Sequence, residues 1–261
     1  MILDVRDVTL EFEGLRALGG VSLSVAEGAL TALVGPNGAG KTSLLNCVGG
    51  FYRPTSGIIQ FKGQPIHGLS PHRIAERGLA RTFQFVELFR HMSVLDNILL
   101  GRHRHMRAGV IAGALFWGRS RGEEIREREH VERIIEFLEV ERFRKELIAN
   151  LPFGIQKLVD IGRALAVEPA LLLLDEPSTG MNREEKENLA RFMLRIKHEL
   201  GTTMLWIEHD MELVADLADT VTVLDFGEKI AEGPPDIILR DPRVAEAYLG
   251  RAYTAEKGSP S

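Results

Sequence analysis

The sequence predicts an α/β fold with a parallel sheet. Short, almost wholly apolar runs, which suit buried strands, alternate with segments whose apolar residues recur at helical spacing. A glycine-rich loop joins the first of these apolar runs to a segment that can be helical. Strands that alternate with amphipathic helices pair in parallel, because each helix carries the chain back across a face of the sheet.

The N-terminal part of the chain is predicted to be β structure. Residues 21–25 alternate valine and leucine with serine, as a strand with one buried face does. Residues 30–34 form a nearly continuous apolar run that stops at Gly35, which is typical of a strand buried on both faces. A helix is expected at 41–48, and residues 57–61 predict another strand.

The middle of the chain, from about residue 86 to 150, has helical periodicity. Its clearest helix is 122–140, where apolar residues at i, i+3, i+4 and i+7 share one face. Strands return at 171–174, 203–207 and 221–224, with an amphipathic helix between the first two. The helical block therefore lies between two parts of the β core, as an insertion does.

Composition limits the classes of function. Of the 261 residues, 44% are apolar, as in a globular protein, and the net charge of -5 argues against a nucleic-acid partner. The only cysteine, Cys47, cannot form a disulfide within the chain, which favours a reducing cytoplasm. We find neither a secretory signal nor an apolar run of about 18 residues, so any membrane crossing is expected to belong to another chain.

Residues 35–42, Gly-Pro-Asn-Gly-Ala-Gly-Lys-Thr, match the phosphate-binding pattern G-x-x-x-x-G-K-[ST]. Glycines let the backbone curl so that its N–H groups point at phosphate oxygens, and the following helix adds its positive end. Lys41 would reach the β- and γ-phosphates of ATP, and the Thr42 hydroxyl would ligate Mg²⁺. A chance match is the weaker interpretation, because the loop follows a predicted buried strand and opens a helix. The predicted nucleotide contacts are Gly35, Pro36, Asn37, Gly38, Ala39, Gly40, Lys41, Thr42 and Ser43.

Two acids, Asp175 and Glu176, end the apolar run 171–174. Ligands of open α/β sheets bind at the carboxyl ends of the strands, so both acids are expected at the phosphate site. Asp175 would hold the Mg²⁺ shell and Glu176 would polarise the attacking water. Taken alone, the pair could also be a solvated strand end.

These motifs resemble the ABC transporter ATPase family, and the resemblance covers nearly the whole chain. The ordered set comprises the loop at 35–42, Gln84, a Leu-x-x-Gly-x-Gln segment at 151–156, the acid pair, residues 178–182 and His209. The resemblance implies a P-loop NTPase core with an N-terminal antiparallel β region and an inserted helical subdomain. It implies an ATP-binding core at 1–85 and 157–235 and a C-terminal helical segment and tail at 236–261. The helical subdomain would span 86–156 and include the family's signature segment, which is residues 151–156 in this chain.

The resemblance also implies residue roles. Phe12 is placed like the aromatic residue that stacks on adenine; the alternative is a simple core residue of a strand. Gln84 is similar to the residue that reaches Mg²⁺ and joins the core to the helical region. His209 resembles the switch histidine that contacts the γ-phosphate. The catalytic set implied is Glu176, His209 and Gln84, and the metal set is Thr42, Gln84 and Asp175.

The segment 151–156 departs from the usual Leu-Ser-Gly-Gly-Gln of this family. ATPases of this family work in pairs, and the serine of the usual pattern contacts the γ-phosphate held by the opposite subunit. At that position this chain has Pro152, which offers neither a hydroxyl nor an N–H. Gly154 and Gln156 remain as predicted contacts to that nucleotide, with help from the helix N-terminus. We expect a working site; the alternatives are a degenerate half-site of low activity or a nucleotide-sensing subunit.

Residues 78–84, 207–211 and 247–250 resemble the branched-chain (hydrophobic) amino acid importer ATPases. The resemblance implies ATP and Mg²⁺ as cofactors, and a peripheral location on the cytoplasmic face of the inner (plasma) membrane. It implies three partners: a second ABC ATPase subunit, identical or related, two transmembrane permease subunits, and a periplasmic or extracellular substrate-binding protein. ATP would close two chains on two nucleotides, and hydrolysis would release them. The alternatives are another cargo, such as urea, an amide or a lipid-linked substrate, a soluble non-transport ABC ATPase, and a P-loop kinase.

Residues 101–122 contain arginines but no acid. One interpretation is a solvated loop with a packed turn. The other is a contact with the membrane subunit or with anionic lipid headgroups. The arginines are Arg102, Arg104, Arg107, Arg119 and Arg121.

Overall fold

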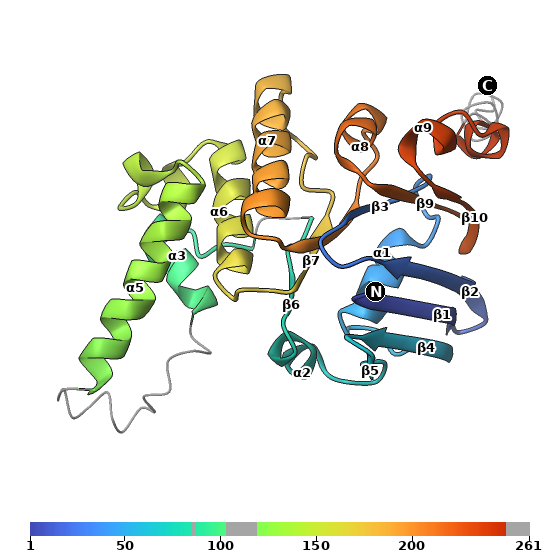
Figure 1. Ribbon diagram of the computed structural model, residues 1–261, viewed down its shortest axis with the longest axis horizontal. Coiled ribbons are helices and arrows are strands. Elements are labelled where there is room, and N and C mark those ends of the chain that lie inside the picture. Colours follow the sequence, from blue (N-terminus) through green and yellow to red (C-terminus); the bar gives the residue numbers. More distant parts are fainter. Residues whose placement is uncertain (85–86, 103–118, 249–261) are drawn as a thin grey trace, which may run out of the picture.

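The computed structural model describes residues 1–84, 87–102 and 119–248, and it confirms the α/β class (Figure 1). A four-stranded antiparallel sheet has the order β2-β1-β4-β5, and a six-stranded sheet has the order β10-β9-β3-β8-β7-β6. Neighbours in the larger sheet pair in parallel, except β10 with β9. The strands are β1 (Leu3–Phe12), β2 (Leu15–Val25), β3 (Leu30–Val34), β4 (Ser56–Phe61), β5 (Gln64–Pro65), β6 (Leu79–Arg81), β7 (Leu171–Asp175), β8 (Thr203–Ile207), β9 (Thr220–Asp225) and β10 (Glu228–Gly233).

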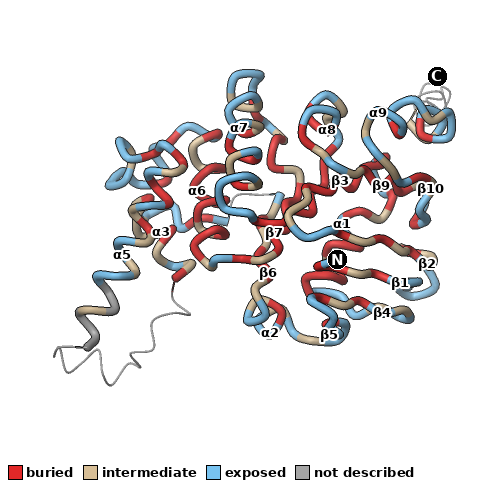
Figure 2. The backbone as a smooth tube through the Cα atoms, viewed as in Figure 1, coloured by how far each residue is buried: buried red, intermediate tan, exposed pale blue. Residues whose placement is uncertain are grey.

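Helices cover the larger sheet on both faces. One face packs on α1, which is enclosed between the two sheets in a core shared with β1, β2 and β4. The other face packs on α6, α7 and α8, and Figure 2 shows the buried residues following the strands and the inner sides of these helices. The helices are α1 (Lys41–Val48), α2 (Pro71–Glu76), α3 (Val94–Gly101), α5 (Arg119–Phe137), α6 (Phe153–Leu165), α7 (Arg183–Glu199), α8 (Met211–Leu217) and α9 (Pro235–Ile238), with 3-10 turns at Glu141–Phe143 and Ile148–Asn150.

The helical region has a hydrophobic core of its own, formed by α3, α5 and α6. The predicted helix at 122–140 is α5, which spans Arg119–Phe137. Arg102, the first arginine of the segment 101–122, is buried: it pairs with Glu127 and donates a 2.8 Å hydrogen bond to the carbonyl of Ala166. Arg102 is therefore a packed internal cation. The side chains of the other four arginines lie outside the described residues.

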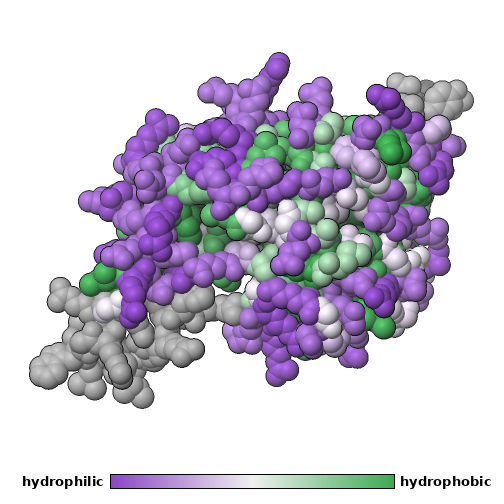
Figure 3. Space-filling view, in the orientation of Figure 1, coloured by the Kyte–Doolittle hydropathy of each residue, from purple (hydrophilic) through white to green (hydrophobic). Residues whose placement is uncertain are grey.

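The parallel sheet places the ends of several strands at one edge. Strands β3, β6, β7 and β8 run in the same direction, so the loops that follow them emerge side by side. Hydrophilic side chains cover most of the rim of the face shown in Figure 3, with hydrophobic ones gathered in patches further in. Among the described helices, none combines the length and the hydropathy needed to cross a bilayer.

Candidate functional site

The phosphate-binding loop leaves β3 and enters α1, as the sequence predicts. Gly35 has a φ of +145°, and a side chain there would meet the carbonyl oxygen of Leu224 at 2.0 Å. Gly40, with a φ of 98°, is the left-handed residue that begins α1. Lys41 is buried, and its Nζ donates to the carbonyls of Gly35 at 2.6 Å and Pro36 at 3.1 Å. The lysine thus lies folded over the loop where phosphate oxygens would bind.

A cavity of about 370 Å³ opens beside this loop. Its lining brings residues 37–43 together with Glu176 and with residues from the antiparallel sheet. Phe12 is not among the described lining residues: it is 42% exposed, and its ring meets that of Tyr52 edge-on at 5.1 Å. Adenine stacking by Phe12 stays a prediction. The lining also includes Leu15, Arg16, Ala17 and Phe226, which the sequence analysis did not single out.

The first acid, Asp175, ends β7 in a buried position. Its Oδ2 accepts a 2.9 Å hydrogen bond from Arg81, the last residue of the neighbouring strand β6. Burial raises the pKa of Asp175 above its ordinary value, and Arg81 opposes that shift. Arg81 belongs to the segment 78–84 that resembles the importer ATPases, but its pairing with Asp175 could not be predicted from the sequence.

The second acid, Glu176, has a φ of 46°, which is uncommon for a residue with a side chain. Its Oε2 accepts hydrogen bonds from Gln84 Nε2 at 2.8 Å and from Thr179 Oγ1 at 3.2 Å. The backbone carbonyl of Gln84 in turn accepts a 2.6 Å bond from Lys157 on α6, a buried lysine whose pKa is lowered by desolvation. The loop after β6 is therefore tied both to the acid and to the helical region.

The loop after β8 carries a buried carboxylate and an exposed imidazole. Glu208 is fully buried; it accepts from the Ser178 hydroxyl at 2.7 Å and from the backbone N–H of His209 at 2.9 Å. His209 itself is 52% exposed at the same sheet edge. One carboxylate thus connects the loop after β7 to the predicted switch histidine.

Comparison with known proteins agrees with this arrangement. The profile of the family described as "ABC transporter" matches residues 18–179. The chain belongs to the ABC transporter ATPase family. The profile described as "Branched-chain amino acid ATP-binding cassette transporter" matches residues 228–254.

Individual relatives extend the likeness over almost the whole chain. The high-affinity branched-chain amino acid transport ATP-binding protein BraF of Pseudomonas aeruginosa is 39% identical over 96% of this chain and 98% of its own. LivG of Escherichia coli, described in the same words, is 36% identical over the same shares. A solved ADP conformation of an ATP-binding cassette of an ABC transporter superposes with a TM-score of 0.84, at 33% identity over 95% of this chain and 98% of that one. These similarities establish an ATPase subunit that binds nucleotide and couples its hydrolysis to transport.

The signature segment of this ABC ATPase, residues 151–156, forms hydrogen bonds within its own chain. Pro152 is the N-cap of α6 and supplies no side-chain cap. The N–H of Gly154 donates to Glu185 Oε1 of α7 at 3.2 Å, and Gln156 Nε2 donates to the Leu151 carbonyl at 2.9 Å. In the single chain, an acid of α7 thus occupies the amide that the sequence analysis assigned to the opposite nucleotide, and this assignment stays a prediction.

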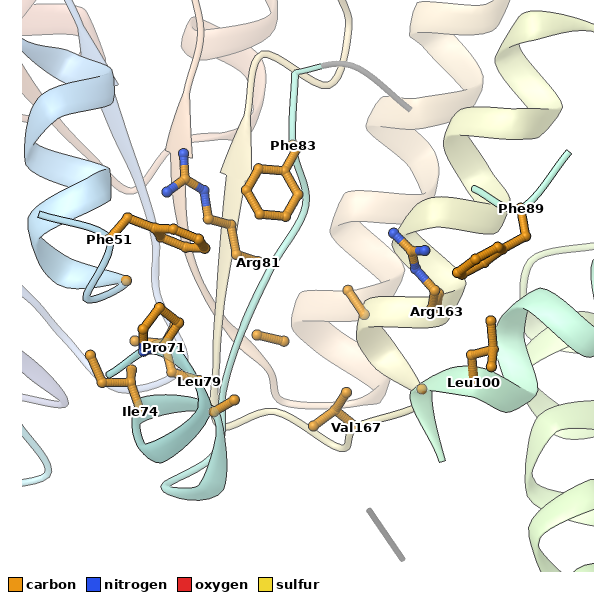
Figure 4. A pocket seen from close by; sticks show the side chains of 15 residues that line it. Phe51, Pro71, Ile74, Leu79, Arg81, Phe83, Phe89, Leu100, Arg163 and Val167 are labelled. Carbon is orange, nitrogen blue, oxygen red and sulfur yellow. The ribbon is translucent and has the colours of Figure 1, made fainter. Parts of the chain in front are cut away.

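A second cavity, of about 500 Å³, lies between the sheet and the helical region of this ABC ATPase (Figure 4). Its walls come from β6 and α2 on one side and from α3 and α6 on the other. Arg81 and Arg163 are its charged lining residues among those described. Arg81 lies between the rings of Phe51 and Phe83 and bonds to Asp175. One side chain therefore both lines this groove-shaped cavity and contacts the acid pair.

Proposed function

We propose that this ABC ATPase drives an importer for branched-chain or other hydrophobic amino acids from the cytoplasmic face of the inner membrane. In this assembly it pairs with a second ATPase chain, identical or related, and with two permease subunits that receive cargo from an external binding protein. The observation that carries the proposal is the likeness to BraF over nearly the full length, including the C-terminal part.

The residues proposed to hold Mg²⁺ suit that ion. Mg²⁺ prefers oxygen ligands, and Thr42 offers an exposed hydroxyl in the first turn of α1. Asp175 commits Oδ2 to Arg81, which leaves its other oxygen for the ion or for water bound to it. Gln84 offers a side-chain carbonyl oxygen close to Glu176. When bound, Mg²⁺ would neutralise charge on the β- and γ-phosphates.

The protein side chains then divide the chemistry among them. Lys41 exchanges its bonds to the loop carbonyls for bonds to phosphate. Glu176 accepts a proton from the attacking water, and its bond to Gln84 holds it in place before nucleotide arrives. His209, exposed at the sheet edge, contacts the γ-phosphate as the pair of chains closes.

Reconstitution of the chain with its permeases and binding protein in lipid vesicles tests the proposal. We expect vesicle ATPase activity to rise when the binding protein is loaded with leucine, isoleucine or valine. Labelled leucine should accumulate in the compartment that faces this chain, and only when that compartment contains ATP. Stimulation by urea or an amide, but by none of the three amino acids, would assign a different cargo.

A further inference from the structure

Arg81 makes a set of contacts that no packing role requires. Its side chain is 7% exposed and bonds to two elements at once: Nη2 donates to Asp175 Oδ2 at 2.9 Å, and Nη1 donates to Asn46 Oδ1 at 2.7 Å. The guanidinium carbon lies 5.4 Å from the ring centroid of Phe51 and 5.0 Å from that of Phe83 (Figure 4). The rings and the two hydrogen bonds together fix the plane of the cation.

Stability alone does not explain this arrangement. A buried ion pair loses solvation on both sides, and well-packed apolar residues often serve a fold as well or better. In the described part of the chain, Nε of Arg81 is buried without a hydrogen-bond partner, which adds to the cost. An arginine buried at this cost beside a proposed metal ligand points to a function in orienting that ligand.

The two elements that Arg81 joins are those that carry the proposed Mg²⁺ ligands. Asn46 lies on α1, the same short helix that begins with Lys41 and Thr42. Asp175 ends β7. A rigid fork that bonds to both elements sets the spacing between the Thr42 hydroxyl and the Asp175 carboxylate, and Lys, a point donor on a flexible stem, cannot reproduce it.

We propose that Arg81 is a positioning residue for the Mg²⁺ site. It holds one oxygen of Asp175 and fixes α1 against β7, so that the remaining carboxylate oxygen and Thr42 are presented together. The inference rests on the proposed role of Asp175 and Thr42 as Mg²⁺ ligands. It adds a residue that touches neither the nucleotide nor the ion, and it gives the groove of Figure 4 a direct connection to the metal site.

The test is a Mg²⁺ titration of nucleotide binding, with a fluorescent ATP analogue as the probe and EDTA as the metal-free reference. For Arg81→Met we expect binding in EDTA to stay unchanged and the Mg²⁺ concentration for half-maximal enhancement to rise about tenfold, the usual effect of losing a residue that orients a metal ligand. Arg81→Lys is expected to recover part of the loss. Asn46→Ala, which leaves the ion pair intact and removes the bond to α1, is expected to shift the titration in the same direction.

Arg163→Met is the matched control. Arg163 lines the same groove and pairs with a buried acid, Asp160, at 2.7 Å, but it does not contact the acid pair. Its titration should follow that of the unmodified chain, and an equal shift would overturn the proposal. An unchanged or lower Mg²⁺ requirement in Arg81→Lys and Asn46→Ala would also overturn it, even if Arg81→Met failed to fold. An unmodified chain whose nucleotide binding ignored Mg²⁺ would instead defeat the metal role of Asp175 and Thr42.

Discussion

Gln84 donates a 2.8 Å hydrogen bond from its side-chain amide to Glu176. The two residues follow neighbouring parallel strands, β6 and β7, so their meeting is a consequence of sheet order. Lys157 fixes the Gln84 backbone from the helical region. A movement of that region is therefore expected to reach the proposed general base through a single loop.

Glu176→Gln is the direct test of that base. The amide keeps the shape of the side chain and a hydrogen bond to its neighbours, but it cannot accept the proton of the attacking water. We expect ATP hydrolysis to fall about 10²- to 10⁴-fold while ATP binding persists, so that an ATP-bound pair of chains accumulates. Phosphate release and size-exclusion chromatography with ATP measure the two effects.

Glu187→Gln provides the comparison for this variant. Glu187 is an exposed acid of α7 that pairs with Arg183, and its loss should leave hydrolysis as it was. A Glu176→Gln protein that turns over ATP at the ordinary rate would remove Glu176 from the chemistry.

The anchorage of the loop that bears His209 is expected to depend on pH. Asp210 caps α8 through Oδ1, and its Oδ2 accepts a 2.6 Å bond from Lys186 of α7. Lys186, followed by the backbone N–H groups of α8, holds the pKa of Asp210 below its ordinary value. A carboxylate with a lowered pKa stabilises the fold above its unfolded pKa, and this contribution disappears as the pH falls through the folded value.

Asp210→Asn keeps the cap but removes the charge. We expect a loss of about 0.5–1 kcal/mol in the free energy of unfolding at pH 7, shrinking towards zero below about pH 4. Urea denaturation across that range measures it. Lys186→Met should cost a similar amount at pH 7, and the double variant should cost no more than either alone. A loss that did not change with pH would show that the pair contributes no charge-dependent stability.

The sequence predicted the sheet and the placement of the phosphate-binding loop between β3 and α1, because both depend on local pattern. Apolar runs that end in Gly35 and Asp175 identify buried strands and the edge where their loops meet. By contrast, the contact of Arg81 with Asp175 depends on the order of the strands, and the place of Phe226 beside the phosphate-binding loop depends on a turn, so neither could be read from a local pattern.

The hydrogen bond between α7 and α6 could not be predicted from the sequence either. Glu185 belongs to a capping box with Asn182, which a sequence pattern can indicate. Its second bond, to Gly154, joins residues 31 positions apart and depends on the packing of α6 beside α7. The spacing of motifs in the sequence therefore predicted where the signature segment lies, but not that Gly154 bonds to Glu185.

That bond leads to a prediction about pairing. The Glu185 carboxylate lies on the Gly154 N–H at the start of α6, where the γ-phosphate of the opposite chain would bind. Two anions compete for one helix N-terminus, and the absence of a serine at position 152 leaves few other donors there. Glu185→Gln should lower the ATP concentration needed for pairing by about three- to tenfold, the effect of removing one screened repulsion.

Light scattering with increasing ATP, in the Glu176→Gln background that prevents hydrolysis, measures this effect. Glu184→Gln is the matched control, because it removes a neighbouring exposed charge from the same first turn of α7. If both variants paired at the same ATP concentration, the general charge of α7 would account for the change. If Glu185→Gln instead required more ATP, the carboxylate would act as a brace that presents α6 to the opposite nucleotide, and competition for the Gly154 amide would be the wrong explanation.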